Sequence, residues 1–84
     1  MSRYTVYHRE ENKALSAGHD HATGSFVQVW DTTKHTHPEE DNMLVDLDEM
    51  FDGLTNEMFL AVMKKHGFEM HELIMAEKEA ESAE

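Results

Sequence analysis

Alternating apolar and polar positions dominate the first part of the chain. Residues 3–8 (RYTVYH) combine aromatic and β-branched side chains that suit a pleated strand. A polar break at residues 9–13 separates them from a short apolar run at residues 14–17. Two apolar runs joined by a short polar break predict a β-hairpin. Residues 18–24 (GHDHATG) are bounded by glycines and predict a structural turn.

The strongest strand signal in the chain lies at residues 25–31 (SFVQVWD). On a strand there, Phe26, Gln28 and Trp30 share one face, and the two valines between them share the other. Because both faces carry large apolar side chains, we expect both faces of the sheet to be at least partly covered.

Residues 31–42 (DTTKHTHPEEDN) contain no apolar residue except Pro38 and predict an exposed, mobile connection. Residues 43–45 can close the sheet as a short strand. Asp46 and Glu49 have the spacing of a helix N-cap and its reciprocal partner. A short helix over residues 47–52, ending at Gly53, is therefore expected.

A longer helix is predicted after Thr55, which offers an N-cap, and before Gly67. Its last turn holds Lys64 and Lys65, the charge that the C-terminal end of a helix dipole favours. A further apolar stripe that begins at Met70 predicts a last helix that reaches about residue 80.

These elements predict an α+β fold. A small antiparallel sheet of three to four strands, formed by the N-terminal half, is expected to pack against two or three C-terminal helices. We expect a single domain over residues 1–80 and a frayed acidic tail over residues 81–84. A homodimer stays open as an alternative, since a core this small can be completed by a second copy.

Charge and composition restrict the function classes. The chain has 84 residues, with 18 Asp and Glu against 7 Lys and Arg, and its formal net charge is −11. No cysteine is present, which excludes a disulfide framework and a thiolate site. No nucleophile-elbow motif is present and no pair of carboxylates stands out, so we expect no enzyme and no cofactor.

The sign of the charge indicates the kind of partner. Lys64 and Lys65 form the only adjacent basic pair, so direct binding to nucleic acid or to an anionic membrane is disfavoured. A strongly negative field instead attracts a basic surface on another protein. No signal-peptide pattern and no apolar stretch of membrane-spanning length is present, which favours a cytoplasmic location.

Two short His-x-His pairs provide the main alternative, a divalent-metal-binding module. They comprise His19, His21, His35 and His37. The seven-residue strand predicted between the two pairs covers roughly 23 Å when extended, which argues against one four-histidine site. Each pair could still bind a metal alone, with Asp20, or with the nearby carboxylates at residues 39–41.

The leading hypothesis is a non-enzymatic interaction protein whose acidic surface engages a basic protein. The expected partner-binding residues are Glu39, Glu40, Asp41, Asp46, Asp48, Glu49 and Asp52. In size, acidity, lack of cysteine and lack of a catalytic motif, the chain resembles the small inhibitors encoded by phages and mobile elements, including anti-CRISPR and anti-restriction proteins. That resemblance implies an inhibitor that blocks a nucleic-acid-binding site on a basic complex.

A structural or assembly subunit is the remaining alternative. It predicts an oligomer held by the apolar side chains of the two longer helices, namely Phe59, Met63, Leu73 and Ile74.

Overall fold

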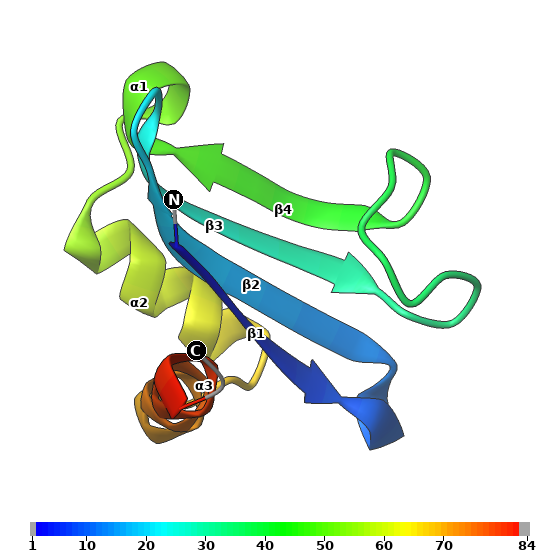
Figure 1. The fold of residues 1–84 in the computed structure, drawn as a ribbon. Coiled ribbons are helices and arrows are strands. Elements are labelled where there is room, and N and C mark those ends of the chain that lie inside the picture. The colour runs from blue at the N-terminus through cyan, green and yellow to red at the C-terminus, as the bar shows by residue number, and fades with distance from the viewer. Residues whose placement is uncertain (1, 83–84) are drawn as a thin grey trace.

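A four-stranded antiparallel sheet forms the centre of the protein, as the computed structural model of residues 2–82 shows, with side chains described as far as Glu79. The strands are β1 (Ser2–His8), β2 (Lys13–Asp20), β3 (Gly24–Asp31) and β4 (Met43–Asp48), and they neighbour one another in chain order. A 3₁₀ turn, η1 (Arg9–Glu11), joins the first two strands. Each strand pairs with the next as a meander (Figure 1).

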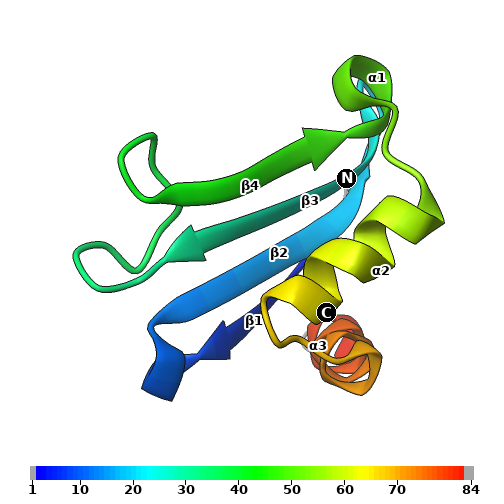
Figure 2. The same ribbon diagram turned by 180° about the vertical axis from the view of Figure 1, so that it is seen from behind.

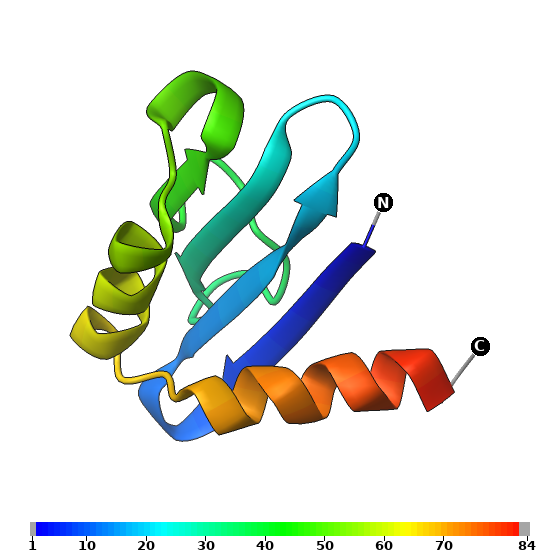
Figure 3. The same ribbon diagram turned by 90° about the vertical axis from the view of Figure 1, so that its left-hand side faces the viewer.

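Three helices follow the sheet: α1 (Glu49–Asp52), α2 (Asn56–Lys65) and α3 (Met70–Ser82). The two longer helices lie on the same face of the sheet, whereas α1 lies at one end of β4 (Figures 1 and 2). Helix α3 runs across the direction of α2 rather than alongside it (Figure 3). The predicted α+β architecture is confirmed.

The core lies between the sheet and the two longer helices. Leu15 and Ala17 of β2 and Val27 and Val29 of β3 present their side chains to this face, because alternate residues of a strand share a face. Met63 of α2 packs against them, and so does Phe68 of the segment between α2 and α3. This cluster is what orders the helices on the sheet.

The opposite face of the sheet is covered by polar and aromatic side chains instead of helices. Arg3 donates from Nη1 to Ser16 Oγ at 3.1 Å and to Gln28 Oε1 at 3.0 Å. Gln28 Nε2 then donates to Asp46 Oδ1 at 3.3 Å, so one row of hydrogen bonds crosses all four strands. Trp30 on this face is only 1% exposed, which confirms that both faces are covered.

The start of the short helix α1 differs from the sequence prediction. The N-cap is Asp48, not Asp46, because β4 continues to Asp48. Leu47 pairs with Val27 and packs against the core, so the chain stays extended for three residues longer than expected. The helix end at Gly53 and the N-cap at Thr55 are both confirmed.

The last helix ends later than the sequence predicts. Helix α3 continues to Ser82, so the first half of the predicted 81–84 tail is helical, and the rest lies outside the described residues. Within residues 2–82, no helix combines the length and the apolar character that crossing a bilayer requires.

Candidate functional site

Strand β4 forms one edge of the sheet, and the predicted binding residues lie on it or next to its two ends. In the described part of the chain it pairs with β3 alone. The loop that precedes β4 and the helix α1 that follows it extend the same edge at both ends (Figure 1). Between Lys34 and Lys64 the sequence contains no Lys or Arg, so no side chain of this segment offsets its carboxylates except by histidine protonation.

The seven predicted acidic residues form a row along this edge rather than one cluster. Three of them precede β4, one lies in its middle, and three lie at its end and in α1. Five strand residues, 43–47, lie between the two end groups and span about 16–17 Å. We call this row the acidic edge; it consists of Glu39, Glu40, Asp41, Asp46, Asp48, Glu49 and Asp52.

Several carboxylates of the acidic edge also fix the local backbone. Asp48 Oδ1 accepts from the N–H of Phe51 at 2.6 Å, and Asp52 Oδ2 accepts from the N–H of Asp48 at 3.0 Å. Glu49 Oε1 accepts from the N–H of Ser25 at 3.0 Å, which ties α1 to β3. Hydrogen bonds from Ser25 lower the pKa of the Glu49 carboxyl and favour its charged form. An ionised carboxylate has two acceptor oxygens, so each can still receive a partner.

Exposed apolar side chains accompany the acidic edge. Phe51 is 76% exposed and Met50 is 66% exposed, both on the single turn of α1. Leu44 of β4 is 49% exposed. The sequence analysis did not single out these three residues, although an apolar pair inside a very short acidic helix is a usable signal. Helix α1 has only four residues, and none of its side chains is buried. Phe51 therefore stays in solvent beside Asp48 and Asp52.

The loop between β3 and β4, residues 32–42, is held by two buried side chains. Trp30 Nε1 donates to the carbonyl of Thr36 at 3.0 Å. Asn42 is 8% exposed; its Oδ1 accepts from the N–H of Glu39 at 2.7 Å. Its Nδ2 donates to two loop carbonyls and to the carbonyl of Asp31 at the end of β3. The loop therefore has a defined hydrogen-bonded conformation, a feature that its polar composition did not reveal.

This conformation brings one of the predicted histidines against two carboxylates. His35 Nε2 lies 3.2 Å from Glu39 Oε2 and 3.3 Å from Asp41 Oδ2. His37 is exposed and is not part of the group. The other pair, His19 and His21, lies at the β2–β3 turn, the opposite end of β3, with ring centroids 6.4 Å apart. The two pairs do not meet.

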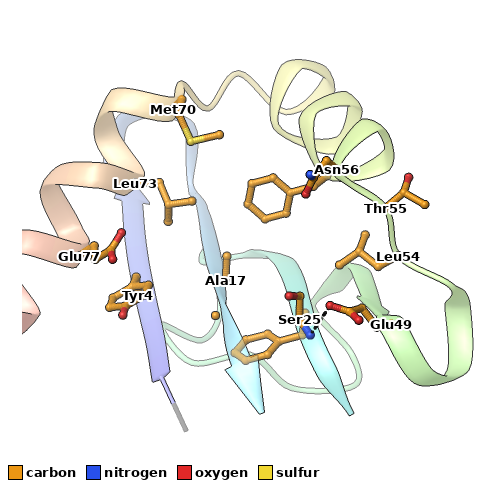
Figure 4. Close-up of a pocket in the computed structure, with 13 residues that line it drawn as sticks. Tyr4, Ala17, Ser25, Glu49, Leu54, Thr55, Asn56, Met70, Leu73 and Glu77 are labelled. Carbon is orange, nitrogen blue, oxygen red and sulfur yellow. Dashed lines mark hydrogen bonds between the residues drawn. The ribbon is translucent and has the colours of Figure 1, made fainter. Parts of the chain in front are cut away.

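A cleft with a volume of about 310 Å³ opens between α2 and α3 over the sheet (Figure 4). Phe59 of α2 and Leu73 of α3 both line it. Figure 4 shows Leu73 above Ala17 and Tyr4 of the sheet. Phe59 and Leu73 also pack against the core, and Met63 lies within it. Three of the four residues suggested for an oligomer contact are thus used inside the chain, and only Ile74 is exposed.

A second histidine contact has a structural role. His8 Nε2 lies 2.6 Å from Glu72 Oε2, which joins β1 to α3, and the His8 ring stacks on Phe68 at 4.2 Å. Burial raises the pKa of Glu72, but hydrogen bonds from His8 and from the N–H of Glu69 lower it, and the net shift is downward. The pair is partly buried and holds the last helix on the sheet.

The chain is a small α+β protein with carboxylates and exposed apolar side chains along one edge of its sheet. Comparison with protein-family models, curated proteins and solved structures gives no match.

Proposed function

We propose that this chain is a non-enzymatic binding protein whose acidic edge docks on a basic surface of another protein. The observation that carries the proposal is the combination found along β4 and α1. Seven carboxylates lie on one sheet edge without a Lys or Arg in the segment, and Phe51 is exposed beside them. Charge of one sign steers a partner of opposite charge and selects against like-charged ones.

The exposed side chains supply the part of the binding energy that charge alone does not. Interfaces typically depend on a few large apolar or aromatic anchors surrounded by polar groups. Phe51 has that position, because Asp48 precedes it by one turn and Asp52 follows it directly. The partner surface that fits is an apolar hollow rimmed by Lys or Arg.

The class of basic surface that we propose is one that otherwise holds nucleic acid. Asp46 and Asp48 lie two residues apart on β4, about 7 Å. That spacing is about twice the axial rise of 3.4 Å per phosphate along one DNA strand. Two carboxylates at this interval can meet side chains that are arranged for successive phosphates. This agrees with the resemblance to small phage and mobile-element inhibitors.

Capture from a lysate of the native host, followed by binding of the purified captured protein, tests the proposal. We expect a basic partner whose affinity falls as salt rises and that releases its nucleic acid when this chain binds. The edge variant is Glu40→Lys/Asp46→Lys, and the matched control is Glu10→Lys/Glu79→Lys. Both variants change the net charge from −11 to −7, since each lysine replaces a carboxylate.

Loss of binding in the edge variant but not in the control supports the acidic edge. The anchor is tested separately by Phe51→Ala against Met75→Ala, which is also exposed but lies on α3. Phe51→Ala is expected to weaken binding about tenfold or more. Equal effects of the two charge variants, or binding that does not change with salt, would contradict the proposal.

A further inference from the structure

The loop that precedes β4 gathers an imidazole and two carboxylates around one point. The ligand atoms of His35, Glu39 and Asp41 all lie within 4.8 Å of one another. We propose that these three side chains bind one divalent transition-metal ion of the zinc, nickel or cobalt type, in a surface site completed by water. This goes beyond the proposed binding function and does not depend on it.

The distances fit such an ion. Zinc lies about 2.0–2.2 Å from nitrogen and carboxylate ligands. Ligand atoms of a tetrahedron are separated by about 1.6 times that length, or roughly 3.4 Å. His35 Nε2 is already 3.2 Å from Glu39 Oε2 and 3.3 Å from Asp41 Oδ2. Only small movements of two exposed carboxylates are needed to bring all three atoms onto one ion.

The charges of the group also favour a cation. A neutral imidazole carries one N–H, so His35 Nε2 can donate to only one of the two carboxylates at a time. Among the described residues, Glu39 and Asp41 lie close to His35, and neither forms a salt bridge with a Lys or Arg. A divalent ion would offset the repulsion between the two carboxylates. It would also accept one lone pair from the imidazole and one from each carboxylate.

The backbone that carries the three ligands is held without their side chains. Asn42 donates to the carbonyls of His35 and His37 and accepts from the N–H of Glu39. Trp30 fixes the carbonyl of Thr36 between them. A site on a pre-ordered loop loses less conformational entropy when the ion binds. The same arrangement allows a ligand side chain to be removed while the loop stays folded.

The mixed ligand set selects the kind of ion. Imidazole suits zinc, nickel and copper, whereas magnesium and calcium prefer oxygen ligands alone. We therefore expect the site to bind zinc or nickel with much higher affinity than magnesium. Of the four histidines that the sequence suggested for a metal, only His35 belongs to this site. The other two ligands, Glu39 and Asp41, belong to the carboxylates at residues 39–41 that the sequence suggested beside the pair of His35 and His37.

The test uses tag-free, chelator-treated full-length protein, because a histidine tag would bind the same ions. Calorimetric titration with zinc chloride is expected to give one site per chain. Cobalt substitution should add visible absorption bands of a low-symmetry site. His35→Ala should weaken zinc binding at least tenfold, while His37→Ala and the double variant His19→Ala/His21→Ala should bind as the wild type does.

Folding of each variant is followed by the near-ultraviolet circular dichroism of Trp30, the only tryptophan. If His35→Ala fails to fold, Glu39→Gln/Asp41→Asn replaces it, and the same loss of zinc binding is expected. Zinc binding that survives these substitutions, that is lost in His19→Ala/His21→Ala, or that magnesium matches, overturns the proposal. Because no partner is present in this titration, its failure leaves the proposed binding function untouched.

Discussion

Replacing Asn42 by alanine should disorder the loop that carries one end of the acidic edge. The side chain makes three short hydrogen bonds: from the N–H of Glu39 at 2.7 Å, to the carbonyl of Asp31 at 2.9 Å and to that of His37 at 3.0 Å. A fourth, to His35, is longer at 3.4 Å. Alanine keeps the backbone hydrogen bonds of residue 42 and removes all four of these.

The expected cost follows from these three short bonds. Each contributes about 1 kcal/mol net, and partners left buried without a bond cost more. Water can reach a loop at the surface and recovers part of the loss, so we expect a fall of about 2–3 kcal/mol in the free energy of unfolding. A domain of this size has a total of roughly 4–13 kcal/mol, and each kcal/mol lowers Tm by about 4–8 °C.

Urea denaturation followed by the fluorescence of Trp30 measures this change. Trp30 donates to Thr36 in the same loop, so its emission should also shift toward that of an exposed indole in the native variant. The matched control is Asn56→Ala, at an exposed position, which should change stability by less than about 0.5 kcal/mol. If Asn42→Ala unfolds within 0.5 kcal/mol of the wild type and the emission is unchanged, the loop does not depend on Asn42.

Two further predictions concern the sheet and its last helix. The pKa of Glu72 lies below its ordinary value, so its contribution to stability is present above about pH 5 and is lost as acid protonates the folded carboxyl. Glu72→Gln should therefore lower the free energy of unfolding by about 1–2 kcal/mol at pH 7, with a difference from the wild type that shrinks toward pH 3 in urea titrations. Gly18→Ala places a Cβ against the carbonyl oxygen of Ser2, closer than any real contact, so β1 must move away, and Tm should fall by at least about 4 °C in a thermal melt. An unchanged Tm would show that β1 accommodates the methyl group without cost.

The sequence predicted the elements whose signals are local. The strand at 24–31, the N-cap at Thr55 and the stop at Gly53 each depend on side chains within a few residues. The predicted start of α1 was wrong because the true start depends on Leu47. Leu47 packs against the core and pairs with Val27, which extends β4. This contact between two strands overrode the better capping pattern at Asp46, and Asp48 caps the helix with Asp52 as its reciprocal partner.

The candidate site was predicted as a set of residues but not as an arrangement. The acidic residues are visible in the sequence, whereas their position on an open sheet edge requires the order of the strands. Asn42 gave no signal, since its four partners are backbone groups that only the folded loop brings together. The sequence suggested a His pair alone or with the carboxylates at residues 39–41; in the structure His35 meets Glu39 and Asp41, but its pair partner His37 does not join them.

The open edge of β4 has a consequence for the behaviour of the protein at high concentration. An edge strand presents unpaired backbone N–H and C=O groups, which can template a strand from another molecule and lead to fibres. If the β4 edges of two molecules paired, their carboxylates would come close together. The repulsion between these like charges opposes such edge-to-edge pairing. The carboxylates that we assign to partner recognition therefore also keep the molecules apart until a cationic surface arrives.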